Sequence, residues 1–408
     1  MIPPRAQGDS GNTGQHRVLG VLGGGQLGAM MLEPMRRLGI QALFLDPDPL
    51  APVGQQYPHF QVGSFRDYDT VLAFGRECDV CTYELEEVHQ GALAQLASEG
   101  KFVAPSPSVL ATLQDKSLQK AFYLRHGLPT APFRHFESKA AMLHFLSEEA
   151  GLEHWSNLKA SGSIVWKSAR GGYDGKGVRL LRGFQDAEAL PDVPCLLEAT
   201  VEIAREFAVL TVRHADGTLK WYDPCLMEFD PEANLVRKVF AGPTGFAEHH
   251  LGANSVRESL KIAGLVAEGL GAVGVLAVEF FLDRGGRLWI NETAPRPHNS
   301  GHYTLEAAYC SQFEQHIRAV MGLPLGDCHL HSHAVMYNLV GQPGHEGPVY
   351  YRGMEEVLSM PGVFVHLYGK AQTRPYRKMG HATVLHRDPA EAARIADQVA
   401  SVLQCVTL

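Results

Sequence analysis

The segment from Lys167 to Gly177 carries the residue types needed to bind a chain of phosphates. It reads KSARGGYDGKG, so four glycines fall within seven residues, with one lysine before them and another among them. Free backbone N–H groups and lysine ammonium groups both bind phosphate oxygens. The segment does not fit G-x-x-x-x-G-K-[ST], which disfavours a P-loop NTPase. We expect a mobile nucleotide-binding loop, and a hairpin tip with solvated lysines is the alternative.

Two acidic residues, Glu279 and Glu292, interrupt apolar segments that read as neighbouring strands. They lie in VLAVEFF and LWINETAP, and the DRGG between these segments is typical of a tight turn. In such a hairpin both carboxylates could face the same side of the sheet. Buried carboxylates need cations, and with Asn291 as a further oxygen donor they suit one or two Mg²⁺ ions that bridge ATP phosphates. Pairing with nearby Arg or Lys is the alternative.

A dense group of hydrogen-bonding side chains follows in PRPHNSGH (295–302). Its prolines restrict the backbone, so Arg296, His298 and Asn299 would be displayed in a fixed arrangement. The spacing is not that of zinc ligands. We interpret this segment as a substrate-binding loop in which Arg296 holds an anion.

Basic side chains gather near the C-terminus of an otherwise acidic chain. His366, Lys370, Arg374, Arg377 and Lys378 fall within thirteen residues, whereas the whole sequence has 36 Lys and Arg against 44 Asp and Glu. Such a cluster suits one phosphate monoester, and a solvated run of charge is the competing interpretation. The net charge of −8 gives no basic field for nucleic acid.

A second glycine-rich turn, GGGQLG (23–28), lies between a short apolar strand and a helical pattern. It fits G-x-G-x-x-G, and Asp46 follows Gly28 by 18 residues, close to the position of the ribose-binding acid in dinucleotide folds. Taken alone, the turn favours a NAD-dependent oxidoreductase. A sugar phosphate at the helix N-terminus, or only a tight turn, would fit equally well. The motif therefore does not decide the function.

The elements that position these residues alternate along the chain. Segments 17–23, 27–38 and 41–48 read as strand, helix and strand, which is a βαβ unit of a parallel sheet. One helix is expected from about Ser108 to Gly127, and the middle of the chain is rich in strands and hairpins. A smaller tail module would contain strands near 333–340, 363–368 and 381–386, and a final helix that begins at Asp388 and Pro389.

Cysteine usage and the N-terminus bear on the compartment. Among seven scattered cysteines only Cys78 and Cys81 form a C-x-x-C pair, so we interpret them as reduced cysteines of a cytosolic core. The first 16 residues have no apolar segment typical of a signal peptide and read as a disordered tail. No run of about 18 apolar residues predicts a membrane span. We expect a cytoplasmic protein that binds neither nucleic acid nor membrane.

The order of these motifs resembles the N5-carboxyaminoimidazole ribonucleotide synthetase family from residue 17 to the C-terminus. The matching segments are GGGQLG, LDPDP, YELEEV, LQDK, GLPTAPF, KSARGGYDGKG, AVEFF, INETAPRPHNSGH, SQFEQHIRAVMGLPLG and RKMGH. The most specific are GGYDGKG and NETAPRPHNSGH. The resemblance implies an ATP-grasp ligase of purine biosynthesis, usually homodimeric. Such an enzyme makes N5-carboxyaminoimidazole ribonucleotide from 5-aminoimidazole ribonucleotide, bicarbonate and ATP with Mg²⁺ (or Mn²⁺).

After the expected disordered tail (1–16), which has no counterpart in the family, the resemblance implies an α/β architecture in three parts. These are a Rossmann-like N-terminal domain (17–113), an ATP-grasp domain (114–326) with a mobile lid at about 160–205, and a small C-terminal substrate-binding module (327–408).

The resemblance assigns a role to each candidate residue. Glu279 and Glu292 would hold the metal, and Arg296 and His298 would face bicarbonate and the exocyclic amine, with Tyr173 and Lys370 as further catalytic candidates. ATP would contact Lys116, Lys167, Gly171, Gly172, Tyr173, Asp174, Gly175, Lys176, Gly177, Glu198, Val201, Glu206, Asn291 and Glu292. The ribonucleotide would contact Gln26, Leu27, Glu84, Tyr173, Asp174, Asn299, Lys370, Arg377 and Lys378.

The implied mechanism activates bicarbonate, which is a poor electrophile. ATP would phosphorylate it to carboxyphosphate while Mg²⁺ and lysine neutralise the developing charge. Water would destroy that species, so the glycine-rich loop would act as a lid. The substrate amine would then attack carboxyphosphate, or CO₂ released from it, and both routes stay open.

The chain departs from the family at one point, and two other functions compete with the implied one. The family commonly has E-N-x-H after the proline that matches Pro224, whereas this chain has PCLMEFD, with Glu228 or Asp230 in place of the histidine. The nearest rival is a formate-dependent ATP-grasp glycinamide ribonucleotide transformylase, against which GGYDGKG and NSGH argue. A non-catalytic nucleotide-binding regulator is disfavoured because both carboxylates and the substrate cations are retained.

Overall fold

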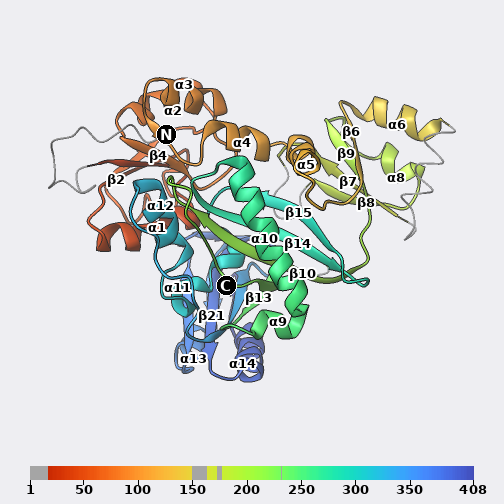
Figure 1. The fold of residues 1–408 in the computed structure, drawn as a ribbon. Helices are drawn as coiled ribbons and strands as arrows, with labels where there is room; N and C mark the ends of the chain where they lie inside the picture. Colours follow the sequence, from red (N-terminus) through yellow and green to blue (C-terminus); the bar gives the residue numbers. More distant parts are fainter. Residues whose placement is uncertain (1–16, 149–162, 172–176, 231) are drawn as a thin grey trace.

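The computed structural model describes residues 17–148, 163–171, 177–230 and 232–408. Figure 1 shows three bodies of mixed α/β structure, with a large central sheet between the N-terminal body and a small lobe that lies on the opposite side. The mixed α/β class predicted from the sequence is confirmed. Among the described residues, no helix combines the length and the apolarity required to cross a bilayer.

The N-terminal body is a five-stranded parallel sheet in the order β3-β2-β1-β4-β5. Strands β1 and β4 are buried at every position, because helices cover both faces of such a sheet. The predicted βαβ unit is confirmed as β1, α1 and β2. The bounds are β1 (Leu19–Leu22), α1 (Gln26–Arg37), β2 (Ala42–Asp46), β3 (Phe60–Val62), α2 (Tyr68–Arg76), β4 (Val80–Tyr83), α3 (Gln90–Ser98) and β5 (Phe102–Val103).

The chain order reverses between β1 and β4, where open α/β sheets commonly bind ligands beyond the carboxyl ends of their strands. The GGGQLG turn follows β1 at this point, and Glu84 follows β4. The topology therefore directs both segments to one edge of the sheet.

The single helix predicted over 108–127 is wrong, because the chain forms two helices there. They are α4 (Pro107–Leu113) and α5 (Lys116–Arg125). The Asp115 side chain accepts hydrogen bonds from the backbone N–H groups of Ser117 at 2.9 Å and Leu118 at 3.4 Å, so it caps a new helix. Aspartate favours this local bond over a helix interior. The break places Lys116 at the start of α5.

The small lobe contains a four-stranded antiparallel sheet in the order β6-β9-β7-β8. Trp166, Phe136 and Met142 pack between the sheet and its helices. The predicted strand–turn–strand over the glycine-rich segment is confirmed by the pairing of β7 with β8. The bounds are β6 (Phe133–Phe136), α6 (Lys139–Ser147), β7 (Ile164–Ser168), β8 (Val178–Leu181), α8 (Phe184–Glu188) and β9 (Cys195–Ala199).

The central sheet has nine strands in the order β15-β14-β10-β12-β13-β16-β21-β19, with β11 paired to β10. The tail-module strands continue this sheet, because β16 pairs with β13. The strand bounds are β10 (Ile203–Arg213), β11 (Leu219–Trp221), β12 (Cys225–Phe229), β13 (Val236–Ala241), β14 (Gly274–Asp283), β15 (Leu288–Ala294), β16 (His333–Val340), β19 (Val363–Leu367) and β21 (Lys378–His386).

Helices and short strands surround this sheet. The predicted cap of the last helix is confirmed, since the Asp388 side chain accepts from the N–H of Ala390 at 2.8 Å and Pro389 is the first helical residue. The helices are α9 (Phe246–Leu251), α10 (Ala253–Leu270), η1 (Asn299–Gly301), α11 (Thr304–Ala307), α12 (Gln312–Met321), α13 (Met354–Leu358) and α14 (Pro389–Val402). The short strands are β17 (Gly347–Pro348), β18 (Tyr350–Arg352), β20 (Gln372–Thr373) and β22 (Gln404–Val406).

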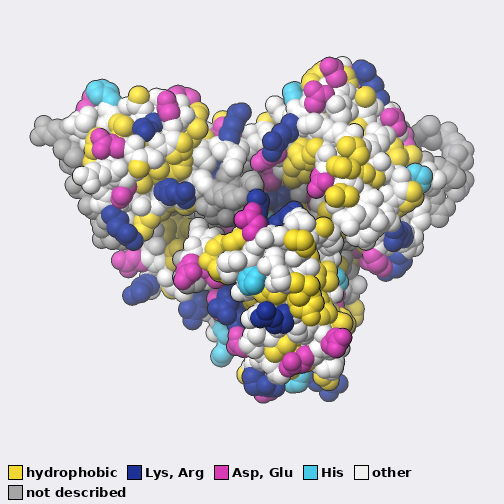
Figure 2. Space-filling model, turned by 180° about the vertical axis from the view of Figure 1, so that it is seen from behind, with side chains coloured by type: hydrophobic (Ala, Val, Ile, Leu, Met, Phe, Trp, Pro, Cys, Tyr) yellow, Lys and Arg dark blue, Asp and Glu magenta, His cyan; other side chains and the backbone are white. Residues whose placement is uncertain are grey.

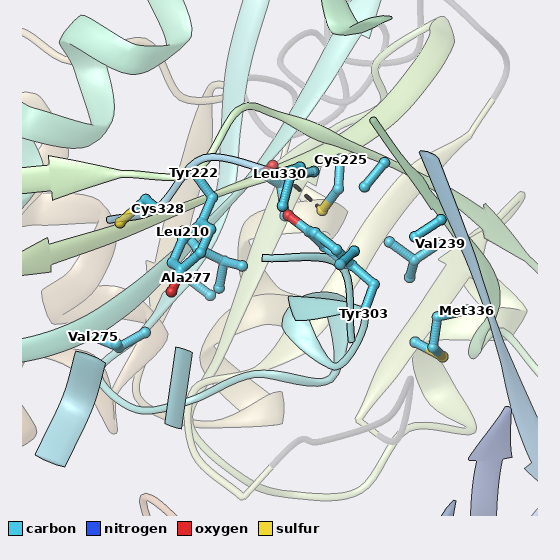
Figure 3. Close-up of a cluster of buried hydrophobic side chains, with 14 of the residues drawn as sticks. Leu210, Tyr222, Cys225, Val239, Val275, Ala277, Tyr303, Cys328, Leu330 and Met336 are labelled. Carbon is cyan, nitrogen blue, oxygen red and sulfur yellow. Dashed lines mark hydrogen bonds between the residues drawn. The ribbon is translucent and has the colours of Figure 1, made fainter. Parts of the chain in front are cut away.

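One apolar cluster joins the central strands to the tail module. Figure 3 shows Tyr222 beside Leu210, and Cys225 and Tyr303 on the side toward Val239 and Met336; all six belong to one buried core. Because Met336 lies on β16, the tail module shares this core as well as the sheet. All seven cysteines, Cys78 and Cys81 included, are buried and free.

Candidate functional site

A cavity of about 1240 Å³ collects side chains from all parts of the molecule. Figure 2 shows the surface hollowed between the lobe and the N-terminal body, with Lys and Arg side chains around the opening. Many of the residues predicted from the sequence line this cavity. They are Gln26, Leu27, Glu84, Lys116, Gly171, Gly177, Arg296, His298, Asn299, Lys370, Arg377 and Lys378.

The two predicted metal carboxylates face each other at the inner side of this cavity. Glu279 and Glu292 are directly opposite in the β14–β15 hairpin, which confirms the predicted register. Two cavity-lining residues touch them: the Lys116 Nζ lies 2.9 Å from Glu292 Oε2, and the His298 Nε2 lies 3.5 Å from Glu279 Oε1. The carboxylate pair and the cavity therefore belong to one site.

The electrostatics of this pair suit a cation. Lys116 lowers the pKa of Glu292, whereas burial and the neighbouring Glu292 raise the pKa of Glu279. Within the described ranges no cluster of three acidic, His or Cys ligands occurs. Two carboxylates are sufficient for Mg²⁺, which keeps water and phosphate oxygens as its other ligands. The donors present therefore fit Mg²⁺ bound together with ATP. Asn291 lies beside them, since its side chain donates to Glu279 Oε2 at 3.4 Å.

A buried ion-pair triad holds Lys167. Glu198 is 4% exposed and contacts Lys167 Nζ at 3.1 Å and Lys120 Nζ at 3.0 Å. Burial would raise the pKa of Glu198, but the two lysines outweigh it and lower the value. The Glu198 carboxylate therefore contacts a lysine with each of its two oxygens. The Lys167 Nζ also donates to Asn291 Oδ1 at 3.0 Å.

Lys120 was not found by the sequence analysis. It is 2% exposed, and burial lowers its pKa to about 8. The signal was its place one helical turn after Lys116, since residues four apart lie on the same face of a helix.

Arg296 is held by an acidic partner that the sequence analysis also missed. Its Nε lies 2.8 Å from Glu86 Oε1, and Glu86 lines the cavity in the segment after β4. The acidic run YELEEV was the available signal, although nothing in the sequence indicates which of its carboxylates faces Arg296. The contact aims the guanidinium into the cavity.

Asn299 is held by the tail module. Its side-chain amide exchanges two hydrogen bonds with that of Asn338, at 2.8 and 2.7 Å, and Asn338 is 1% exposed on β16. Asn338 is a further residue without a sequence signal. Through the contact between Asn338 and Asn299, strand β16 of the central sheet holds the PRPHNSGH loop in place.

The GGGQLG turn binds carboxylates of the protein itself. Glu84 accepts from the N–H groups of Gly25 at 2.6 Å and Gly28 at 2.7 Å, and Asp46 accepts from the N–H of Gly24 at 2.8 Å. Glu84 therefore stands where a dinucleotide fold would place the pyrophosphate, and Asp46 is engaged by the turn. This geometry contradicts the dinucleotide interpretation of the motif.

Four members of the predicted basic cluster reach the cavity, and one does not. Lys370, Arg374, Arg377 and Lys378 line it, which disfavours the interpretation as a solvated run of charge. His366 was included in the cluster from its position in sequence, but its Nε2 lies 2.6 Å from Glu306 Oε1. The His366 ring therefore contacts Glu306 and does not line the cavity.

The other predicted residues are distributed as follows. Glu206 is half-buried on β10, and burial raises its pKa to about 7. Val201 lines a separate cavity of about 360 Å³. In the PCLMEFD segment, Glu228 is exposed, and Asp230 accepts from the N–H groups of Glu232 and Ala233 at 3.0 and 2.9 Å. Gly172, Tyr173, Asp174, Gly175 and Lys176 lie outside the described residues.

Comparison with known families matches three consecutive parts of the chain. The ribonucleotide synthetase preATP-grasp domain matches residues 17–114, and the ATP-grasp domain matches residues 121–313. The phosphoribosylaminoimidazole carboxylase C-terminal domain matches residues 334–395. These families together span most of the described chain.

Curated relatives agree with these matches. An N5-carboxyaminoimidazole ribonucleotide synthase of Brucella melitensis is 34% identical over 371 residues, which are 90% of this chain and 95% of that protein. A chloroplastic phosphoribosylaminoimidazole carboxylase of Vigna aconitifolia is 33% identical over 90% of this chain. The chain spans 64% of the length of that plant protein.

Solved structures show the same likeness. The N5-carboxyaminoimidazole ribonucleotide synthetase of Thermotoga maritima superposes with a TM-score of 0.82 and 35% identity, covering 96% of this chain and 100% of that one. The synthase of Aspergillus clavatus in complex with ADP and 5-aminoimidazole ribonucleotide has a TM-score of 0.83 and 29% identity, covering 95% and 99%.

Proposed function

This chain belongs to the N5-carboxyaminoimidazole ribonucleotide synthetase family of ATP-grasp ligases, and from that premise we propose its reaction and the residues that perform it. The enzyme carboxylates the exocyclic amine of 5-aminoimidazole ribonucleotide to N5-carboxyaminoimidazole ribonucleotide in purine biosynthesis. It consumes ATP and bicarbonate and releases ADP and phosphate. The observation that carries this proposal is the junction at Lys116 and His298, where the carboxylate pair meets the anion-binding cavity.

The nucleotide side of the site is formed by lysines and the carboxylate pair. Lys116 and Lys167 would bind ATP phosphates, and Glu279 and Glu292 would hold Mg²⁺ with Asn291 beside them. When bound, the metal supplies charge neutralisation for phosphoryl transfer to bicarbonate. The glycine-rich loop that joins β7 and β8, which includes Gly171 and Gly177, would cover the phosphates and exclude water.

The ribonucleotide side is formed by the N-terminal turn and the tail module. Gln26 and Leu27 would contact the ribonucleotide where the GGGQLG turn meets the cavity. Lys370, Arg377 and Lys378 would bind its phosphate, because they form the basic wall of the same cavity. Asn299 would orient the base.

The reacting groups would meet between these two sides. Arg296, aimed by Glu86, would hold the bicarbonate-derived anion, and its planar guanidinium suits two oxygens of a carboxylate or phosphate. His298 lies between Glu279 and the cavity, where it would face the exocyclic amine, and either His298 or Tyr173 would take the amine proton. Carboxyphosphate and CO₂ released from it are both compatible with this arrangement.

The test is ADP release from the purified protein with MgATP and bicarbonate, with and without 5-aminoimidazole ribonucleotide. We expect strong stimulation by the ribonucleotide. Formate with glycinamide ribonucleotide in place of the two substrates should give no stimulation. A folded protein that binds ATP but shows no dependence on 5-aminoimidazole ribonucleotide would contradict the proposed substrate.

A pH dependence follows from Glu206, which we propose contacts the ATP ribose. Because burial raises its pKa to about 7, the carboxylate that can accept a ribose hydroxyl predominates above that pH and is lost below it. At pH 6 only about a tenth of the sites would be competent, so the KM for ATP should be up to about tenfold higher than at pH 8. Initial rates over this range should show the effect, and Glu206→Gln should retain only the pH dependence of ATP itself. The same slope in both proteins would disprove this role.

The remaining features of the proposal rest on the family resemblance. We place the domain limits at 113/114 and 326/327, with the lid at about 160–205. We further propose a homodimer in the cytoplasm.

A further inference from the structure

One buried side chain outside the cavity lining holds the backbone of His298 from behind. Gln312, the first residue of α12, is 0% exposed. Its Oε1 accepts from the His298 N–H at 2.9 Å, and its Nε2 donates to the His298 carbonyl at 2.7 Å. One amide group thus binds both polar backbone groups of the residue that reaches Glu279.

The end of the same loop is fixed to the same helix. The Thr304 hydroxyl donates to the Gly301 carbonyl at 2.6 Å and accepts from the Gln312 N–H at 3.0 Å. Gly301 packs so closely on Gln312 that a Cβ there would lie 2.6 Å from the Gln312 side chain. The loop segment 298–301 therefore rests directly on the first turn of α12.

Helix α12 packs against the N-terminal body. Phe313 and Ile317 pack in one core with Leu27 and Met31 of α1, and Figure 1 shows the two helices side by side. On the same helix, the His316 Nε2 hydrogen bonds to the Thr82 hydroxyl of β4 at 2.8 Å. A side chain at the start of this helix consequently has a fixed position relative to the β1–β4 edge.

We propose that Gln312 is a positioning residue for the reaction, which holds the His298 backbone so that the His298 and Arg296 side chains keep their places between the carboxylate pair and the cavity. The proposal rests on the proposed function for the identity of the reaction. Helix α12 would thus connect the N-terminal body to the loop that bears the reacting groups. A displacement of about 1 Å at reacting groups can cost about 100-fold in rate.

The chain contains a matched control on the same helix. Gln315 is also 0% exposed, and its amide binds one backbone residue in the same way, through the Gly326 N–H at 3.0 Å and the Gly326 carbonyl at 2.9 Å. Gln312→Leu and Gln315→Leu therefore remove the same chemistry from equally buried positions. Only the first change releases the loop at the site.

The first measurement is hydrogen exchange of the peptide 294–303 without substrates. Exchange should be faster in Gln312→Leu than in the wild type, whereas in Gln315→Leu the acceleration should appear around residue 326. The second is steady-state kinetics of ribonucleotide-dependent ADP release. Gln312→Leu should lower kcat by about 10- to 100-fold and leave the KM for ATP unchanged, while Gln315→Leu should keep the wild-type kcat.

If Gln312→Leu does not fold, Gln312→Met carries the same comparison, because it keeps a long unbranched side chain and removes both the acceptor for the His298 N–H and the donor to the His298 carbonyl. Equal exchange at 294–303 in the Gln312 and Gln315 variants would overturn the clamp. Faster exchange with an unchanged kcat would overturn the positioning role. A wild type without ribonucleotide dependence would instead sink the proposed function, and the exchange result would still report on the clamp.

Discussion

Glu292→Gln should lower ribonucleotide-dependent ADP release by about 100- to 1000-fold, which is typical of removing one group that stabilises charge in a transition state. The change keeps the shape of the side chain but removes the charge that faces Lys116 and Glu279, where we propose that Mg²⁺ binds. Mn²⁺ affinity in the presence of ATP should fall in the same variant. Enzyme assays and a Mn²⁺ titration measure the two effects.

The matched control is Glu258→Gln, which changes an exposed carboxylate on α10 outside the cavity lining. It should retain the wild-type rate and the wild-type affinity for Mn²⁺. A normal rate in Glu292→Gln at saturating Mg²⁺ would show that this carboxylate is not part of the metal site. If both variants lost rate and Mn²⁺ affinity equally, the effect would come from the lower negative charge of the whole protein and not from a metal site at Glu292.

Arg296→Met should reduce kcat/KM for bicarbonate by about 100- to 1000-fold, because the anion would lose the cation that we propose binds it. The KM for ATP should change little, since Lys116 and Lys167 remain in place. Arg296→Lys should recover only part of the loss, because a lysine keeps the charge without the planar fork. Initial rates at varied bicarbonate measure this difference.

The partner of Arg296 supplies the control for this variant. Glu86→Gln leaves the guanidinium in the cavity and removes only the carboxylate that aims it at 2.8 Å. We therefore expect a smaller loss than in Arg296→Met. Activity in Arg296→Met that depends on bicarbonate as in the wild type would disprove the role of Arg296 as the anion clamp.

The sequence was sufficient for the elements whose pattern is local. The βαβ unit, the hairpin that carries Glu279 and Glu292, and the cap at Asp388 were predicted correctly, because each depends on residues close together in the chain. The helix over 108–127 was predicted wrongly, although its break is also local. Asp115 offers the backbone a local bond that the apolar periodicity did not reveal.

The GGGQLG motif did not by itself predict what its turn binds. Its glycines and the acid at Asp46 fit a dinucleotide fold, yet the carboxylate that fills the turn comes from Glu84, 59 residues from Gly25. No property of the turn itself indicates that the acid after β4 will bind there. The packing of β1 beside β4 decides it.

By itself, the sequence determined the kinds of chemistry available: phosphate-binding glycines and lysines, a carboxylate pair and a donor-rich loop. Only the tertiary structure decided which of these groups meet, because their contacts join segments far apart in the chain. Lys116 contacts Glu292, which is 176 residues away in the chain. Asn299 binds Asn338 of the central sheet, and Gln312 binds His298 from a helix that packs on the N-terminal body. Burial then selects the partners, since a buried polar or charged group is stable only where its counterpart is already in place.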